Sequence, residues 1–366
     1  MRPLFVLLHF LAHCAMMAAE IPTQKRGIPV KEKLDRFLNK ILQEKHIAGF
    51  SLAITDRHQV LYSGGFGLMD AEQASSATQA ETIYRIASIT KIVTGMVILK
   101  LWEENRLSLT EPVITYIPWL RENPNWKKDI TLTHLLSHTA GLPVEYTPDG
   151  PRDEGLLEES LKKELLEIPE IPDEENRGYL YSNLGIRLAS LAAQNVTGKP
   201  YSVLAREYVL DPLGMTQTDF DRKKLWECPV SFPHTYGDGG FEVSHYIMEN
   251  AVRLAAGGLY SNVLELSKLA RCILNEGKPV LSAESIAKMR QQRAQVAEGR
   301  GYGLTTQIFA YPDGVLYGHL GNAYPYGGSL LVDMEKGIGV CLLMNTFDDG
   351  LRTELTKEIF ALLKEE

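Results

Sequence analysis

Strand-like and helix-like patterns divide this chain into three stretches, and that division constrains the fold more than any other feature. Alternating apolar runs lie near both ends, whereas helical periodicity dominates from residue 88 to about residue 275. The expected strands cover residues 49–55, 59–64, 302–309, 315–319, 328–333 and 337–345. The expected helices cover residues 30–46, 89–104, 131–137, 154–167, 182–196, 200–210, 263–276 and 353–364.

One mixed, mostly antiparallel sheet built from both chain ends is the simplest fold for this order of elements. The terminal helices then cover the sheet, and the helical middle forms a second lobe. The sequence therefore predicts an α/β (α+β) fold in a single domain over residues 30–362. Residues 30–87 and 277–362 are expected to form the sheet lobe and residues 88–276 the mainly helical lobe, with a binding cleft between the two.

Charge and the first residues bound the partners and the compartment. The chain has 38 basic and 46 acidic residues, a net charge of -8 and no dense basic block, so nucleic acid is not an expected partner. Residues 1–19 place Arg2 before an apolar run and end in small residues, as a secretory signal peptide does. That run is too short to span a bilayer. We therefore expect export to the periplasm or the extracellular space, with a lipid anchor through Cys14 as an alternative.

A serine and a lysine stand at the start of the first helix of the middle stretch. Ser88 and Lys91 are three residues apart, so both side chains lie on one helical face within hydrogen-bonding reach. A serine hydroxyl becomes a strong nucleophile when a neighbouring base takes its proton, and a lysine in apolar surroundings can be that base. The same spacing is also a common coincidence, so its meaning depends on the rest of the chain.

Two later elements decide between these interpretations. Tyr181-Ser182-Asn183 falls where a loop enters a helix, so either the serine or the asparagine can be an N-cap rather than a functional group. His319-x-Gly321 lies between two expected strands, where a lone histidine is usually structural. Each element alone favours the structural interpretation.

Together and in this order, the three elements resemble the serine β-lactamase and penicillin-binding protein superfamily. The tyrosine and histidine motifs are similar to the branch that contains class C β-lactamases, D-alanyl-D-alanine carboxypeptidases, D-aminopeptidases and related esterases. Further segments that resemble the branch are residues 130–143, 211–215 and 256–261. The resemblance extends over about residues 30–362 and implies a β-lactamase/transpeptidase-like fold.

The resemblance implies that Ser88 attacks an acyl carbonyl and forms an acyl-enzyme. Tyr181 and Lys91 share the proton transfers, and the sequence leaves open how they divide them. Asn183 is expected to orient the amide of the substrate. The backbone N–H groups of Ser88 and Asn322 are expected to form the oxyanion hole.

The third motif carries a departure from the β-lactamases. Gly321 is expected to let the substrate lie along the strand edge, and His319 to contact the substrate. This histidine replaces a lysine that helps hold the substrate carboxylate in β-lactamases, and a neutral imidazole holds anions less firmly. The replacement favours a peptidase or an esterase over a dedicated β-lactamase.

The sequence thus predicts an exported serine hydrolase that cleaves amide or ester bonds, foremost as a D-alanyl-D-alanine carboxypeptidase or related D-peptidase. An esterase and a class C-like β-lactamase are alternatives, and a non-catalytic penicillin-binding relative is an alternative of another class. The expected partners are small molecules or peptides: a cell-wall-type D-peptide, an ester or a β-lactam. No cofactor or metal is expected, because His134 and His138 lack a His-Glu-x-x-His pattern and are interpreted as structural.

Overall fold

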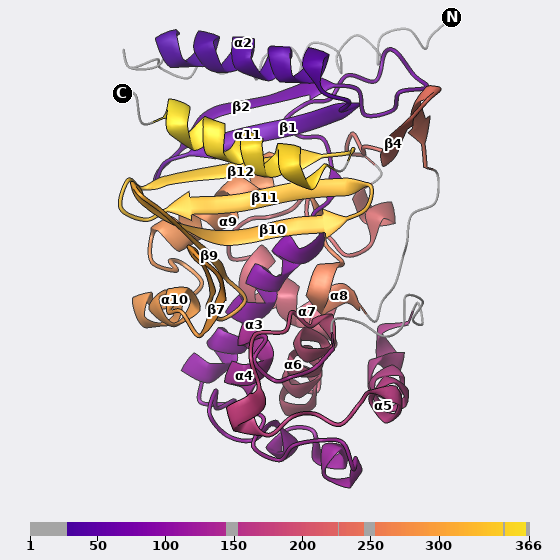
Figure 1. Ribbon diagram of the computed structural model, residues 1–366, viewed down its shortest axis with the longest axis vertical. Helices are drawn as coiled ribbons and strands as arrows, with labels where there is room; N and C mark the ends of the chain where they lie inside the picture. The colour runs from indigo at the N-terminus through magenta and orange to yellow at the C-terminus, as the bar shows by residue number, and fades with distance from the viewer. Residues whose placement is uncertain (1–27, 144–152, 226, 245–252, 347, 364–366) are drawn as a thin grey trace, which may run out of the picture.

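An eight-stranded sheet forms the centre of the computed structural model, which describes residues 28–143, 153–225, 227–244, 253–346 and 348–363. The strand order is β2-β1-β12-β11-β10-β9-β8-β7, and every paired strand is antiparallel (Figure 1). The strands are β1 (Gly49–Thr55), β2 (Val60–Gly67), β7 (Ala294–Ala297), β8 (Arg300–Tyr302), β9 (Gln307–Tyr311), β10 (Gly314–Ala323), β11 (Tyr326–Asp333) and β12 (Ile338–Met344). The expected signal segment 1–19, including Cys14, lies outside the described residues.

Helices cover both faces of this sheet. The terminal helices α2 (Ile28–Glu44) and α11 (Asp349–Leu362) lie together on one face, and α9 (Val263–Leu274) packs against the other (Figure 1). Side chains of a strand alternate between the faces, so Leu342 of β12 joins the core under the terminal helices while Leu343 joins the core under α9. Two apolar layers therefore stabilise the sheet.

The second lobe is a set of helices around α3 (Thr90–Glu103), which is buried on nearly all sides as a helix that is apolar all round should be. The other helices are α4 (Leu132–Ser137), α5 (Leu157–Glu167), α6 (Asn183–Thr197), α7 (Tyr201–Ala205), α8 (Leu254–Gly257) and α10 (Ala283–Arg290). Two small ladders pair β3 (Tyr84–Arg85) with β6 (Tyr260–Ser261) and β4 (His234–Gly237) with β5 (Gly240–Val243).

The predicted fold class is confirmed, and one predicted strand is wrong. Residues 302–309 form no single strand, because the chain reverses between β8 and β9. At the reversal Thr305 adopts a left-handed φ of 50° and its backbone N–H donates to Leu136 O at 2.8 Å. This contact with α4 depends on tertiary packing, so no local sequence pattern predicts it. The hairpin β4–β5 and the helix α10 were not predicted from the sequence.

Two helices depart from the predicted division of the chain into lobes at residue 276. The helix α9, which ends before it, packs against strands of the sheet. The helix α10, which follows it, contacts α3 in the helical lobe. Both lobes therefore draw elements from either side of the expected boundary.

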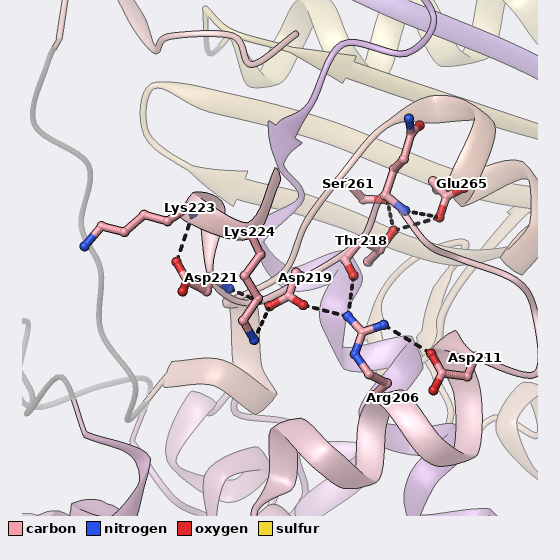
Figure 2. A network of polar contacts seen from close by, with 10 residues as sticks. Arg206, Asp211, Thr218, Asp219, Asp221, Lys223, Lys224, Ser261 and Glu265 are labelled. Carbon is pink, nitrogen blue, oxygen red and sulfur yellow. Dashed lines mark hydrogen bonds and ion pairs between the residues drawn. The ribbon is translucent and has the colours of Figure 1, made fainter. Parts of the chain in front are cut away.

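A charged network links the turn after α7 to β6 (Figure 2). Arg206, in the π-helical turn Arg206–Leu210, donates to Asp211 at 3.1 Å and to Asp219 at 2.6 Å. Thr218 then hydrogen-bonds Ser261 of β6 at 2.7 Å. The Arg206 side chain is 37% exposed, so this network lies at the surface and each charge has an opposite charge beside it.

Candidate active site

Ser88 sits at a sharp bend between the sheet lobe and the helical lobe. It lies in the 3₁₀ turn Ala87–Ile89, which packs against β10 and leads directly into α3. Ala87 has a φ of 49°, a left-handed conformation that costs free energy in any residue other than glycine. The bend leaves the Ser88 hydroxyl at the surface of a cleft, where an acyl group can reach it.

Lys91 is fully buried in the first turn of α3, three residues after Ser88. Its Nζ lies 2.9 Å from Ser88 Oγ, 2.7 Å from Asn183 Oδ1 and 2.6 Å from Ala256 O. As an ammonium, the group donates to all three oxygens. As a neutral amine, it donates to Asn183 and Ala256 and directs its lone pair at the Ser88 hydroxyl. The geometry therefore suits Lys91 both as a fixed charge and as the base that activates the serine.

Tyr181 approaches Ser88 from the opposite side. Its hydroxyl lies 2.9 Å from Ser88 Oγ, and Lys91 Nζ lies 4.9 Å from the centre of its ring. The next residue, Ser182, is the N-cap of α6 and accepts from Gly185 N at 3.2 Å. The two alternatives for this motif are thus both realised: the serine caps the helix, and Asn183 faces the lysine.

His138 holds the tyrosine in place. Its carbonyl accepts from Leu180 N at 2.8 Å and its ring Nδ1 accepts from Ser182 N at 3.1 Å, so it brackets Tyr181 on both sides. The ring also lies against the Tyr181 ring, with 4.3 Å between centroids. His134, by contrast, takes part in the capping box at the start of α4. Both histidines have the structural roles expected of them.

The edge of β10 forms one wall of the cleft. Asn322 is exposed and lines the same cleft as Ser88, which is where an oxyanion donor is needed. Arg352 of α11 is buried behind this strand and donates to Gly321 O at 3.0 Å and to Asn322 Oδ1. The role of the Asn322 N–H group as an oxyanion donor stays a prediction.

Two residues of the third motif lie behind the cleft wall instead of facing a substrate. His319 is 1% exposed, and its ring nitrogens contact Tyr302 Oη at 2.9 Å and Leu320 O at 2.6 Å. Gly321 is buried, and a Cβ added there would lie 2.3 Å from Ile86 O. The expectation of direct substrate contact is therefore corrected for both. The glycine lets β10 approach the bend that carries Ser88, and the histidine is held inside the protein.

The cleft in front of Ser88 has a volume of about 490 Å³. Its described lining comes from both lobes and contains two guanidinium groups, Arg85 and Arg253, and no aspartate or glutamate. Tyr324 stands at the rim with 72% of its surface exposed. The cleft therefore combines positive charge with aromatic surface next to the nucleophile.

Sequence reasoning missed several residues that surround the site. Arg85 stands three residues before the nucleophile and lines the cleft, and a guanidinium can bind a carboxylate. Arg253, Tyr302 and Arg352 carry no spacing signal, because tertiary packing alone brings them to the site. Within the described ranges, no group of three histidine, cysteine or acidic side chains is arranged to hold a metal, and no helix is long and apolar enough to cross a membrane.

Comparison with known proteins places this geometry in a family. A sequence model of the family described as Beta-lactamase matches residues 34–364. Esterase EstB of Burkholderia gladioli is 27% identical, over 88% of this chain and 92% of the esterase. Protein flp of Staphylococcus aureus is 33% identical over 52% of this chain, and the match spans only 38% of that longer protein.

Solved structures agree on the fold. The octameric penicillin-binding protein homologue from Pyrococcus abyssi superposes with a TM-score of 0.73 at 27% identity, over 86% of this chain and 73% of that one. D-amino acid amidase from Ochrobactrum anthropi superposes with a TM-score of 0.79 at 20% identity, over 93% of this chain and all of the amidase. With the family match over nearly its whole length and with Ser88 in contact with both Lys91 and Tyr181, the chain belongs to the β-lactamase family.

Proposed function

We propose that the enzyme hydrolyses D-amino-acid-containing peptides that end in a free carboxylate, as a D-alanyl-D-alanine carboxypeptidase or related D-peptidase does. The observation that carries this proposal is the cleft itself, in which Ser88 opens onto a lining that includes Arg85 and Arg253 and no described acidic residue. A guanidinium binds a carboxylate through paired hydrogen bonds. A peptide with a terminal carboxylate therefore complements this cleft better than a neutral amide does.

The acylation step uses the contacts around Ser88. Its Oγ attacks the carbonyl carbon while its proton passes to a base, either Tyr181 as a phenolate or Lys91 as a neutral amine, whose polar atoms both lie 2.9 Å away. The carbonyl oxygen becomes an oxyanion in front of the backbone N–H groups of Ser88 and Asn322. The C–N bond then breaks, the leaving amine takes the proton, and an ester links the acyl group to Ser88.

Deacylation repeats these steps with water in place of the amine. The same base takes a proton from a water molecule that attacks the ester carbonyl. The C–O bond to Ser88 breaks, the serine oxygen regains its proton, and the free acid leaves. Lys91 keeps its contacts with Asn183 and Ala256 throughout, so it fixes one side of the reacting group.

An esterase activity is the second candidate. Its specific support is the match to esterase EstB over most of both chains. A class C-like β-lactamase has weaker support, because the buried His319 cannot hold a β-lactam carboxylate from β10. A non-catalytic penicillin-binding relative is disfavoured by the complete set of contacts around Ser88. Export remains part of the proposal on the strength of residues 1–19.

Matched substrates test the proposal. We expect kcat/KM for an acylated D-Ala-D-Ala peptide to exceed that for the same peptide with a C-terminal amide by about 10-fold or more, as expected for a charge-assisted contact. Arg253→Met should remove most of this preference, and Ser88→Ala should lower turnover roughly 10⁴-fold or more. Equal turnover of acid and amide would contradict carboxylate recognition, and faster turnover of p-nitrophenyl esters than of any peptide would favour the esterase.

A further inference from the structure

Three buried aromatic side chains form a continuous hydrogen-bonded chain behind the active site. His138 Nε2 lies 3.1 Å from Tyr302 Oη, and Tyr302 Oη lies 2.9 Å from His319 Nε2. None of the three is more than 1% exposed. They come from three separate parts of the fold: the C-terminus of α4, the end of β8 and the middle of β10. The catalytic steps above use none of them.

The ends of this chain fix the direction of every hydrogen bond in it. The backbone N–H of Ser182 can only donate, so His138 Nδ1 is the acceptor and its Nε2 carries the proton. The carbonyl of Leu320 can only accept, so His319 Nδ1 carries the proton and its Nε2 is the acceptor. Tyr302 therefore accepts from His138 and donates to His319. The two histidines are neutral and hold opposite tautomers.

The surroundings keep both imidazoles neutral. Burial, and then the nearby charge of Lys91, lower the pKa of His319 to about 3. Burial and Lys91 also hold the pKa of His138 well below its ordinary value. The hydroxyl of Tyr302 stays protonated, because burial raises its pKa well above 10. All three side chains are therefore neutral at pH 7, as the hydrogen-bond pattern requires.

The hydrogen-bonded chain connects the segment that carries Tyr181 with the strand that carries Asn322. One end is His138, which brackets Tyr181 through Leu180 and Ser182. The other end is the backbone of β10 at Leu320, two residues before Asn322. A change of about 1 Å in the position of a reacting group can cost roughly 100-fold in rate, so the separation of these two segments matters for catalysis.

We propose that His138, Tyr302 and His319 are positioning residues that set the distance between Tyr181 and the β10 edge through a one-way chain of neutral hydrogen bonds. The proposal rests on the proposed role of Tyr181 in proton transfer. It gives the histidine of the third motif a task in place of substrate contact. This role requires both tautomers. Moving the proton to the other nitrogen of His138 would place two donors opposite each other, and moving it in His319 would place two acceptors opposite each other.

The first test reads the tautomers directly and needs no activity. Long-range ¹H–¹⁵N spectra of the ¹⁵N-labelled enzyme at pH 7 should show one buried histidine protonated at Nε2 and another protonated at Nδ1. Assignment by His138→Gln and His319→Gln should give the first pattern to His138 and the second to His319. The same tautomer in both rings, or a charged ring at either position, would overturn the proposal.

The second test measures positioning through Tyr302→Phe, which keeps the ring and removes the central hydroxyl. Active sites are counted with a fluorophosphonate label, so that loss of folded protein does not enter the rate. We expect kcat per labelled site on p-nitrophenyl acetate to fall about 10- to 100-fold with KM changed less than about twofold. In a Tyr181→Phe background, the same substitution should cost less than about twofold, because the group it positions is gone.

Tyr84→Phe is the matched control, since it removes a fully buried hydroxyl that bonds Ser51 at 2.9 Å in the sheet. It should lower the melting temperature without changing kcat per labelled site. Equal effects of Tyr302→Phe and Tyr84→Phe on kcat, or additive effects of the Tyr302 and Tyr181 substitutions, would refute the positioning role. A wild-type enzyme that takes the label but turns over no substrate would instead refute the proposed function, and the tautomer test would still stand.

Discussion

The Arg206 network and the Lys91 site both place a cation among polar groups, but they differ in what surrounds the charge. Arg206 lies at the surface between the carboxylates of Asp211 and Asp219 (Figure 2). Lys91 is fully buried, and the three oxygens that hold its amine at 2.6 to 2.9 Å are neutral. Carboxylates cancel the electric field of a cation, whereas neutral oxygens orient the cation without cancelling its field. The first arrangement ties neighbouring segments of the helical lobe together, and the second can act on a reaction.

The largest effect should come from removing the buried cation. Lys91→Met keeps much of the apolar volume and should lower kcat/KM about 10²- to 10⁴-fold, because both the charge and a possible base are lost. The melting temperature should change little or rise, since a buried amine is no longer desolvated. Unchanged kcat/KM in a variant that still takes up the active-site label would contradict a role of the buried lysine in the reaction.

Close packing at the site gives the next effect. Gly321→Ala places a methyl group 2.3 Å from Ile86 O, so β10 must move away from the bend that carries Ser88. We expect the free energy of unfolding to fall by about 1–3 kcal/mol, measured by urea denaturation. Gly178→Ala, which has open space around the added Cβ, should stay within about 0.5 kcal/mol of the wild type. Equal stabilities would show that the strand adapts freely.

Acid should weaken the fold through the two buried histidines. In the unfolded chain they take up protons below about pH 6.5, whereas in the folded protein the pKa of His319 is about 3 and that of His138 is also lowered. Their contribution is therefore fully present above about pH 6.5 and is lost as the pH falls. His319 should add about 1.4 kcal/mol per pH unit to the slope of unfolding free energy between about pH 6 and 4, and His138 should act in the same direction. A His319→Gln variant with an unchanged slope would contradict this.

The smallest effect is expected in the surface network. Arg206→Met removes two ion pairs of a side chain that is 37% exposed, so the unfolding free energy should fall by about 1 kcal/mol or less. Because the network does not reach the cleft, kcat/KM should stay within about twofold of the wild type. High salt should reduce the difference in stability between variant and wild type. A larger loss of activity than of stability would show that this network also serves catalysis.

Sequence reasoning located the site where short-range geometry decides it. Spacing places Ser88 and Lys91 on one helical face, and the order of the three motifs, through their resemblance to the β-lactamase superfamily, adds Tyr181 to them. It failed where distant segments meet. The resemblance predicts His319 at the cleft, in place of the substrate-binding lysine of β-lactamases, but a strand has two faces and the motif does not say which one the histidine occupies.

The same reason explains what the fold prediction missed. The alternation of residues 302–309 fits a strand, yet the bond from Thr305 to Leu136 turns the chain into a hairpin. Tyr302, at the start of that hairpin, thereby comes to lie between two histidines far from it in sequence. Contacts that form only in the tertiary structure leave no periodic pattern in the sequence, so the positions of these residues could not be predicted from it.

The position of β1 in the sheet has a consequence for synthesis on the ribosome. β1 pairs with β12 over six positions, from Phe50 with Met344 to Thr55 with Gly339, so the first hairpin of the chain must wait for one of its last strands. At the usual rates of translation this wait lasts roughly 15–60 s. During it, the apolar edge of β1 is open to other nascent chains. Chaperone dependence and slow maturation should therefore accompany an enzyme whose catalytic serine is made early and whose sheet closes late.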